Sequence, residues 1–151
     1  MHDYKEKLNS LGLKATPQRL SMIDLLMTHG HMSIDAIYDK LKGESASLSL
    51  STVYNNLYAL GEKGILREVA ISGSRHVYEL VKEEHAHLLC NGCGSILDLS
   101  VDLEKIQSAA TLPKGAMITQ SDLIFSGYCP KCAAASKETP NEAPAELSVS
   151  L

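Results

Sequence analysis

The sequence lacks several features that would place it in a common class of protein. It has no apolar run near the ~20 residues of a membrane-spanning helix, no internal repeat outside its cysteine pairs, and no loop of the kind that cradles phosphates. It also lacks an excess of positive charge, since the net charge at pH 7 is -4. These absences disfavour a membrane protein and a phosphate-loop enzyme. They also predict weak binding to nucleic acid unless the chain dimerises or binds cations.

The charge is divided unevenly along the 151 residues. Residues 1–82 carry 10 basic and 9 acidic side chains, whereas residues 83–151 carry 4 basic and 9 acidic ones. The length allows one ordinary domain or two small ones. A near-neutral half joined to an acidic half indicates two modules with different roles. We therefore expect one domain over 1–81 and a second over 82–133.

Cysteine is absent outside two short pairs. All four cysteines lie in C-x-x-C motifs, Cys90 with Cys93 and Cys129 with Cys132. Four thiolates are enough to close a tetrahedral Zn²⁺ site. The 35 residues from Gly94 to Tyr128 are too many for a compact zinc ribbon, so a folded domain must bring the pairs together.

The alternative for these cysteines is two disulfides, which need an oxidising compartment. No secretory signal precedes the start MHDYKEKLNS, so we expect a cytoplasmic protein with a structural zinc ion.

The first half has helical periodicity followed by two strand-like segments. Thr16 and Pro17 suit the N-cap and first turn of a helix, and Gly30 suits its end. Helices are expected at 3–11, 17–29, 34–42 and 52–60, and strands at 65–69 and 76–81. Helices followed by a hairpin are typical of a winged helix-turn-helix domain. A helical bundle without a binding role remains the alternative.

The second half has a mixed pattern, so the fold class is α+β. Strands are expected at 86–89, 95–99 and 116–125, and a helix at 102–111. From Ala133 the chain is rich in Ala, Pro, Glu and Ser, and we expect 134–151 to be a disordered tail.

A second group of ligand-type residues precedes the first cysteine pair. His85 and His87 are two residues apart, which on a strand places both imidazoles on one face. Neutral imidazoles with carboxylates form a nitrogen and oxygen set that suits Fe²⁺, Mn²⁺ or Zn²⁺. The candidate carboxylates are Glu79, Glu83, Glu84 and Asp98, and His31 could contribute from the first half. The alternative is that these histidines are solvated or packed without a metal.

Several motifs, in this order, resemble the ferric uptake regulator family of metal-responsive bacterial repressors, and within it the peroxide-sensing branch. The motifs are LKATPQR (13–19), His31, STVYNNL (51–57), RHVYE (75–79), HAHLLCNGCG (85–94) and YCPKC (128–132). The resemblance implies an N-terminal winged-helix domain, an α/β dimerisation domain, and a homodimer that represses by binding a double-stranded DNA operator with an inverted repeat when its regulatory metal is bound.

The resemblance also implies roles for individual residues. Structural zinc is held by Cys90, Cys93, Cys129 and Cys132. Regulatory Fe²⁺ or Mn²⁺ is held by His31, Glu79, His85, His87 and Asp98. DNA is contacted by Lys14, Arg19, Ser51, Thr52, Tyr54, Asn55 and Asn56.

Two features favour the peroxide-sensing branch, namely Asp98 and the TVYNNL helix, whereas Glu79 is a contrary sign. In that branch iron and peroxide oxidise a regulatory histidine, here His31 or His85. The alternative is an iron-sensing repressor with the same fold and ligands. Two further alternatives are a two-histidine, carboxylate metalloenzyme and a zinc-stapled interaction module without a switch.

Overall fold

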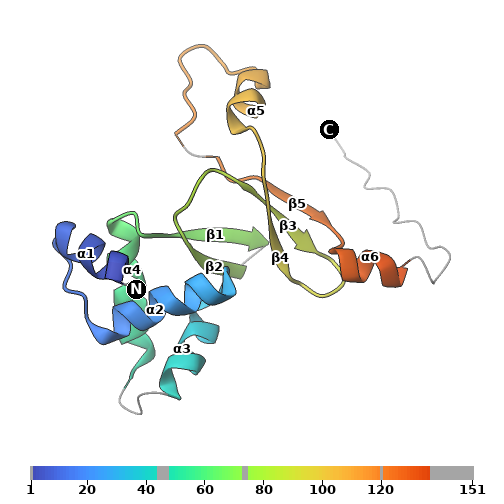
Figure 1. Ribbon diagram of the computed structural model, residues 1–151. Helices are drawn as coiled ribbons and strands as arrows, with labels where there is room; N and C mark the ends of the chain where they lie inside the picture. The colour runs from blue at the N-terminus through green and yellow to red at the C-terminus, as the bar shows by residue number, and fades with distance from the viewer. Residues whose placement is uncertain (1, 44–47, 73–74, 120, 137–151) are drawn as a thin grey trace. The chain divides into compact units, whose positions relative to one another are not determined.

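The chain folds into two compact units, Met1–Glu83 and Glu84–Leu151. The computed structural model describes residues 2–43, 48–72, 75–119 and 121–136 (Figure 1). The expected tail lies mostly outside these described residues. Within them, no helix has the length and apolar character needed to cross a bilayer.

The first unit begins with four helices, α1 (His2–Ser10), α2 (Pro17–His29), α3 (Ile34–Lys42) and α4 (Leu50–Glu62). Short polar side chains fix their starts. Thr16 accepts a hydrogen bond from the backbone of Arg19, and Ser33 accepts one from Ala36, so both act as N-caps. Gly30, with φ of 73°, ends α2 as the sequence predicts. These helices bury one continuous core, to which Met22, Ile37 and Leu57 contribute fully buried side chains.

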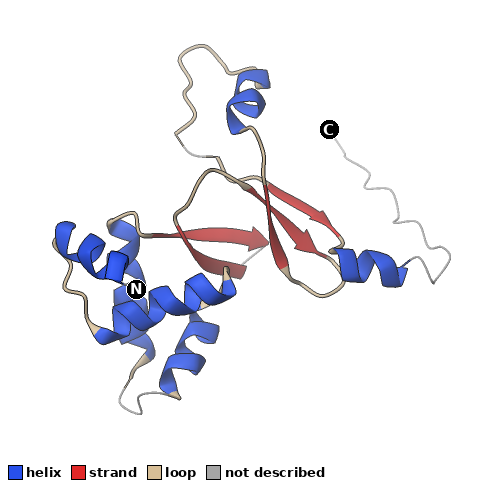
Figure 2. Cartoon of the chain, viewed as in Figure 1, coloured by secondary structure: helices blue, strands red, loops and turns tan. Residues whose placement is uncertain are grey.

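A hairpin completes the first unit. Strands β1 (Leu66–Ser72) and β2 (Arg75–Leu80) pair antiparallel (Figure 2). Their inward residues Val69 and Val77 are buried. A helical cluster followed by a two-stranded hairpin is a winged helix-turn-helix arrangement, so the predicted architecture is confirmed.

Helix α4 is longer at both ends than the predicted 52–60. It starts at Leu50 because Ser49 supplies the N-cap, accepting from the Thr52 backbone N–H at 3.1 Å. It continues through Gly61 to Glu62, because the buried Leu57 and Leu60 anchor its last turns. The chain turns at Gly64, which has a φ of 63°.

The second unit is built on a mixed three-stranded sheet. Its elements are β3 (Ala86–Cys90), β4 (Ile96–Leu99), α5 (Leu103–Ala109), β5 (Ile124–Gly127) and α6 (Pro130–Ser136). The strand order is β4-β3-β5, with β4 antiparallel and β5 parallel to β3. The helix expected at 102–111 is α5, which Asp102 caps by accepting from the Lys105 backbone N–H at 3.0 Å.

Two predictions for the second unit are wrong. The strand expected at 116–125 begins only at Ile124, because β3 offers a partner edge to residues 124–127 alone. Residues 134–136, which were expected to belong to a tail, are helical, since α6 extends to Ser136. Residues 133–135 are all alanine, the residue type with the highest helix propensity, and they prolong the helix that starts at Pro130.

Candidate metal centres

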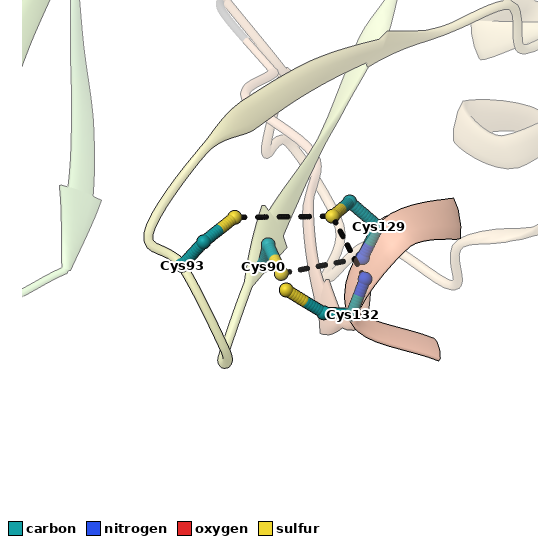
Figure 3. Close-up of side chains that lie close together, drawn as sticks. All are labelled: Cys90, Cys93, Cys129 and Cys132. Atoms are coloured by element: carbon teal, nitrogen blue, oxygen red, sulfur yellow. Dashed lines mark hydrogen bonds between the residues drawn. The ribbon is translucent and has the colours of Figure 1, made fainter. Parts of the chain in front are cut away.

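The four cysteine side chains converge on one point in the second unit. Their Sγ atoms all lie within 4.8 Å of one another. Cys90 ends β3, Cys93 lies in the following turn, Cys129 follows β5, and Cys132 is on α6. Figure 3 shows the sulfur atoms turned toward each other, with Cys93 Sγ 3.8 Å from Cys129 Sγ.

The sheet register brings the two pairs together. Strand β5 runs parallel to β3 with Gly127 opposite Cys90, and the Asn91 backbone N–H donates to the Gly127 carbonyl at 2.7 Å. The first pair is folded by a tight turn in which Gly94, at φ of 69°, donates to the Cys90 carbonyl. The pairing of β3 with β5 thus brings together two cysteine pairs that are separated by 35 residues in the sequence.

The electrostatics of the cluster call for a cation. The Cys129 backbone N–H donates to Cys90 Sγ at 3.2 Å and is the main reason that the pKa of Cys90 is lowered to about 6. In contrast, the neighbouring Cys129 sulfur, followed by those of Cys90 and Cys93, raises the pKa of Cys132 to about 12. Four thiolates cannot coexist here without positive charge. A closed set of four sulfur ligands fits a tetrahedral structural zinc ion.

The first unit holds two of the predicted regulatory ligands side by side. His31 Nε2 lies 3.0 Å from Glu79 Oε2. A backbone bridge creates this contact, because Met32 and Tyr78 exchange hydrogen bonds of 3.1 and 2.8 Å, which places the residue before Met32 beside the residue after Tyr78. Glu79 is only 1% exposed. A carboxylate so deeply buried needs compensating positive charge or a metal.

The second unit holds the other three. His87 pairs with Asp98 across β3 and β4, and His85 precedes β3. The two imidazole rings lie 4.7 Å apart at their centroids, and Asp98 Oδ1 lies 3.7 Å from His85 Nε2 and 4.0 Å from His87 Nε2. Both histidines are buried, so they are not the solvated pair of the alternative interpretation. Glu83 and Glu84 are exposed, unlike Glu79.

The predicted regulatory ligands thus form two groups, one in each unit, that consist of imidazole nitrogens and carboxylate oxygens. This donor set fits Fe²⁺ or Mn²⁺ better than a soft thiolate site would.

Helix α4 carries most of the predicted DNA contacts, and its side chains differ in availability. Tyr54 is 55% exposed, and Asn55 is also exposed. Ser51 and Thr52 contact the Ser49 hydroxyl at 2.9 and 2.8 Å within the N-cap. Asn56 donates to the Thr52 carbonyl at 2.9 Å. Tyr54 and Asn55 are therefore the exposed predicted contacts of α4 that lie outside its N-cap.

The two remaining predicted DNA contacts lie at the start of α2. Lys14 is exposed, and Arg19 is partly exposed. Arg19 Nη1 donates to the Lys14 carbonyl at 2.9 Å. Arg19 therefore also fixes the backbone that presents Lys14.

Sequence reasoning missed Arg67. Its Nε lies 2.5 Å from Glu79 Oε1. The signal that could have revealed it is the hairpin register, which places Arg67 directly opposite Glu79. The exact register depends on the turn between the strands, and the sequence-based strand bounds were too approximate to fix it.

The ferric uptake regulator family model matches residues 10–126. The chain belongs to the ferric uptake regulator family. Regulators of this family are metal-dependent, DNA-binding dimers rather than enzymes, which disfavours the metalloenzyme interpretation.

Among similar proteins, the peroxide operon regulator of Bacillus subtilis is 31% identical over 87% of this chain and 94% of its own length. The crystal structure of the Campylobacter jejuni peroxide stress regulator is 31% identical, with a TM-score of 0.62 over 87% of this chain and 97% of its own. The Vibrio cholerae ferric uptake regulator is 29% identical, with a TM-score of 0.68 over 83% and 99%. Both branches of the family thus share the fold described above.

Proposed function

We propose that this ferric uptake regulator family protein is a peroxide-sensing repressor of the PerR type. It binds an inverted-repeat DNA operator as a homodimer and loses the operator when peroxide oxidises a histidine of its regulatory site. The observation that carries the proposal is the buried pair His85 and His87 beside Asp98, with His31 beside Glu79 in the other unit. The similarity to the Bacillus subtilis peroxide operon regulator supports this branch.

In this proposal a single Fe²⁺ or Mn²⁺ ion is shared by the ligands of both units. The chain keeps the two groups of ligands near each other. Glu79 and His85 are six residues apart, and at ~3.5 Å per residue their backbones can be separated by at most roughly 20 Å. An ion held by both units favours the one arrangement of the units in which all ligands reach it. In a dimer that arrangement decides whether two α4 helices fit successive major grooves. Metal binding and operator binding are thereby coupled.

The signal is a covalent change at His31 or His85. His31, Glu79, His85, His87 and Asp98 would hold Fe²⁺, which would provide one-electron redox chemistry linking peroxide reduction to oxidation of the imidazole. In the net change, a ring C–H of the imidazole gains one peroxide oxygen, and the other oxygen leaves as water. The imidazole is oxidised by two electrons, and the peroxide is reduced by two. An oxidised ring is a poorer ligand, so the ion is released and the two units are freed from the operator-binding arrangement.

The DNA-contacting residues divide by role. Tyr54 and Asn55 on α4 read bases, because an Asn amide can pair with adenine and an aromatic ring can contact a thymine methyl. Arg19 neutralises a backbone phosphate and positions the domain, and Lys14 reaches into the minor groove. Because the chain has a net charge of -4, one protomer should bind DNA weakly. Tight operator binding therefore needs a dimer with its metal ions bound. The reduced state of the zinc thiolates is consistent with a cytoplasmic location, which is part of the proposal.

Operator binding under defined metal and peroxide tests this function. The zinc-loaded protein is given Fe²⁺ or Mn²⁺ and measured on an inverted-repeat operator before and after brief peroxide exposure. We expect both metals to support binding, and peroxide to abolish it only for the iron form. Equal persistence of both forms would favour the iron-sensing alternative, to which Glu79 points. Binding independent of any added metal would favour the interaction module without a switch.

A further inference from the structure

The two oxygens of the Glu79 carboxylate face different partners within the first unit. Oε2 lies 3.0 Å from His31 Nε2 and 3.9 Å from Lys82 Nζ. Oε1 lies 2.5 Å from Arg67 Nε. The Glu79 side chain is 1% exposed and that of Arg67 is 32% exposed, so a buried carboxylate is paired with a partly exposed arginine. One oxygen of this predicted metal ligand is therefore already engaged by a permanent cation.

This pairing is built into the hairpin. Arg67 on β1 is the direct cross-strand partner of Glu79 on β2, so their side chains share one face of the ribbon. An arginine keeps its charge at every physiological pH, and its planar fork matches a carboxylate. A bound metal ion would come and go with the metal concentration, and a flexible lysine could move away. The Arg67 charge faces Glu79 whenever the hairpin is folded.

We infer that Arg67 competes with the regulatory metal for Glu79 and thereby sets the affinity of the site, an inference that rests on the proposed role of Glu79 as a ligand. The guanidinium and a divalent cation offer positive charge to the same buried carboxylate. Arg67 therefore stabilises the metal-free state more than the metal-bound state. The coupling is reciprocal: the free energy that the Arg67–Glu79 pair contributes to the metal-free state lowers the net free energy of metal binding.

The competing interpretation is that Arg67 only orients Glu79. Residues that hold a metal ligand in place typically contribute about 10- to 100-fold to metal affinity, so their removal weakens binding. Competition predicts the opposite sign. The direction of the change in affinity therefore separates the two roles, and a purely structural cross-strand ion pair would leave affinity unchanged.

Arg67→Met tests the inference, because methionine keeps much of the aliphatic stem and removes the charge. Mn²⁺ affinity is measured on the zinc-loaded, full-length protein by competition with a fluorescent chelator, which avoids iron oxidation. We expect about tenfold tighter binding. Removing the charge that pairs with a buried carboxylate has a large effect on its interactions, but the partial exposure of Arg67 weakens the pair and reduces that effect. Should Arg67→Met be insoluble, Arg67→Gln is measured instead, with the same expected sign.

Lys63→Met is the matched control for loss of one positive charge. Lys63 is exposed at the C-terminal cap of α4. It should leave Mn²⁺ affinity within about twofold, because an exposed charge is screened by solvent and salt. If Mn²⁺ affinity rises equally in Lys63→Met and Arg67→Met, the cause is the change in net charge of the protein, and the inference is overturned.

Thermal unfolding supplies a second readout. Without Mn²⁺, Arg67→Met should melt below the wild type, because the buried Glu79 carboxylate loses the guanidinium at its Oε1. Mn²⁺ should raise the melting temperature of the variant by more than that of the wild type. Unchanged or weaker Mn²⁺ binding in Arg67→Met would overturn the competition.

A separate variant keeps failure of the inference distinct from failure of the proposed function. His87→Ala should abolish Mn²⁺ binding in an otherwise wild-type chain. If it does not, the regulatory site itself is wrong, whatever Arg67→Met shows. If it does, and Arg67→Met fails to tighten binding, the regulatory site stands and the role of Arg67 as a competitor is wrong.

Discussion

Gly92→Ala should damage the zinc site without altering any zinc ligand. A Cβ at position 92 would lie 2.9 Å from Cys132 Sγ and 3.0 Å from Cys132 Cβ. Carbon makes its best contacts at about 3.5–4.0 Å. Cys132 or the turn must therefore move by about half an ångström or more. Zinc sites tolerate only about 0.2 Å in their ligand distances, so the displaced sulfur cannot keep a normal bond to the ion.

The expected cost is that of overpacking, about 1–3 kcal/mol. At about 1.4 kcal/mol for each factor of ten, zinc affinity should fall by roughly 5- to 150-fold. The assay is zinc transfer to a chromophoric chelator at equilibrium, with circular dichroism recorded on the same samples. Gly61→Ala is the control, because its new methyl group would meet Leu66 Cδ1 at an ordinary 3.8 Å. If Gly92→Ala retains zinc as tightly as Gly61→Ala, the four-sulfur geometry described here is wrong.

Three further predictions concern a zinc ligand, the DNA contacts and the pH dependence of zinc binding. Cys93→Ser should lose tightly bound zinc, dimerisation and solubility, because metal binding at a closed site contributes folding free energy; a zinc-loaded dimer would contradict the staple. Tyr54→Ala should cost about 1–3 kcal/mol on the operator and little on random DNA, whereas Arg19→Ala should weaken both and lower the salt slope by about one; competition binding at several salt concentrations separates them. Zinc binding to the stripped protein near neutral pH should release the proton of Cys132, whose pKa is raised to about 12, and affinity should fall as the pH drops through about 6, where Cys90 also protonates; calorimetry in buffers of different ionisation enthalpy measures this, and a pH-independent affinity would contradict it.

Features specified by local spacing were predictable from the sequence. Two C-x-x-C pairs identify four zinc-type ligands from the sequence alone, and the structure brings Cys90, Cys93, Cys129 and Cys132 into one cluster that fits zinc. The N-cap at Thr16 and the helix end at Gly30 were likewise predictable, because capping depends on neighbouring residues.

Features that depend on distant pairing were not predictable. The late start of β5 follows from its pairing with β3, which involves residues 124–127. The local sequence of 116–123 does not encode whether a partner strand is present. Helix α6 was missed because an alanine-rich run after a cysteine pair has the composition of a tail, although alanine also favours helix. The contact of Arg67 with Glu79 needs the register of the hairpin to within one residue, since a slip of one moves a side chain to the other face.

In the proposed function, the protein senses peroxide through oxidation of a regulatory histidine. Mass spectrometry of peptides from the iron-loaded protein after brief peroxide exposure tests it most directly. We expect one added oxygen atom on a peptide containing His31 or His85 with iron and peroxide together, and none with Mn²⁺ and peroxide. Intact histidines in the iron form, with operator binding retained after peroxide, would contradict it and assign the protein to the iron-sensing branch.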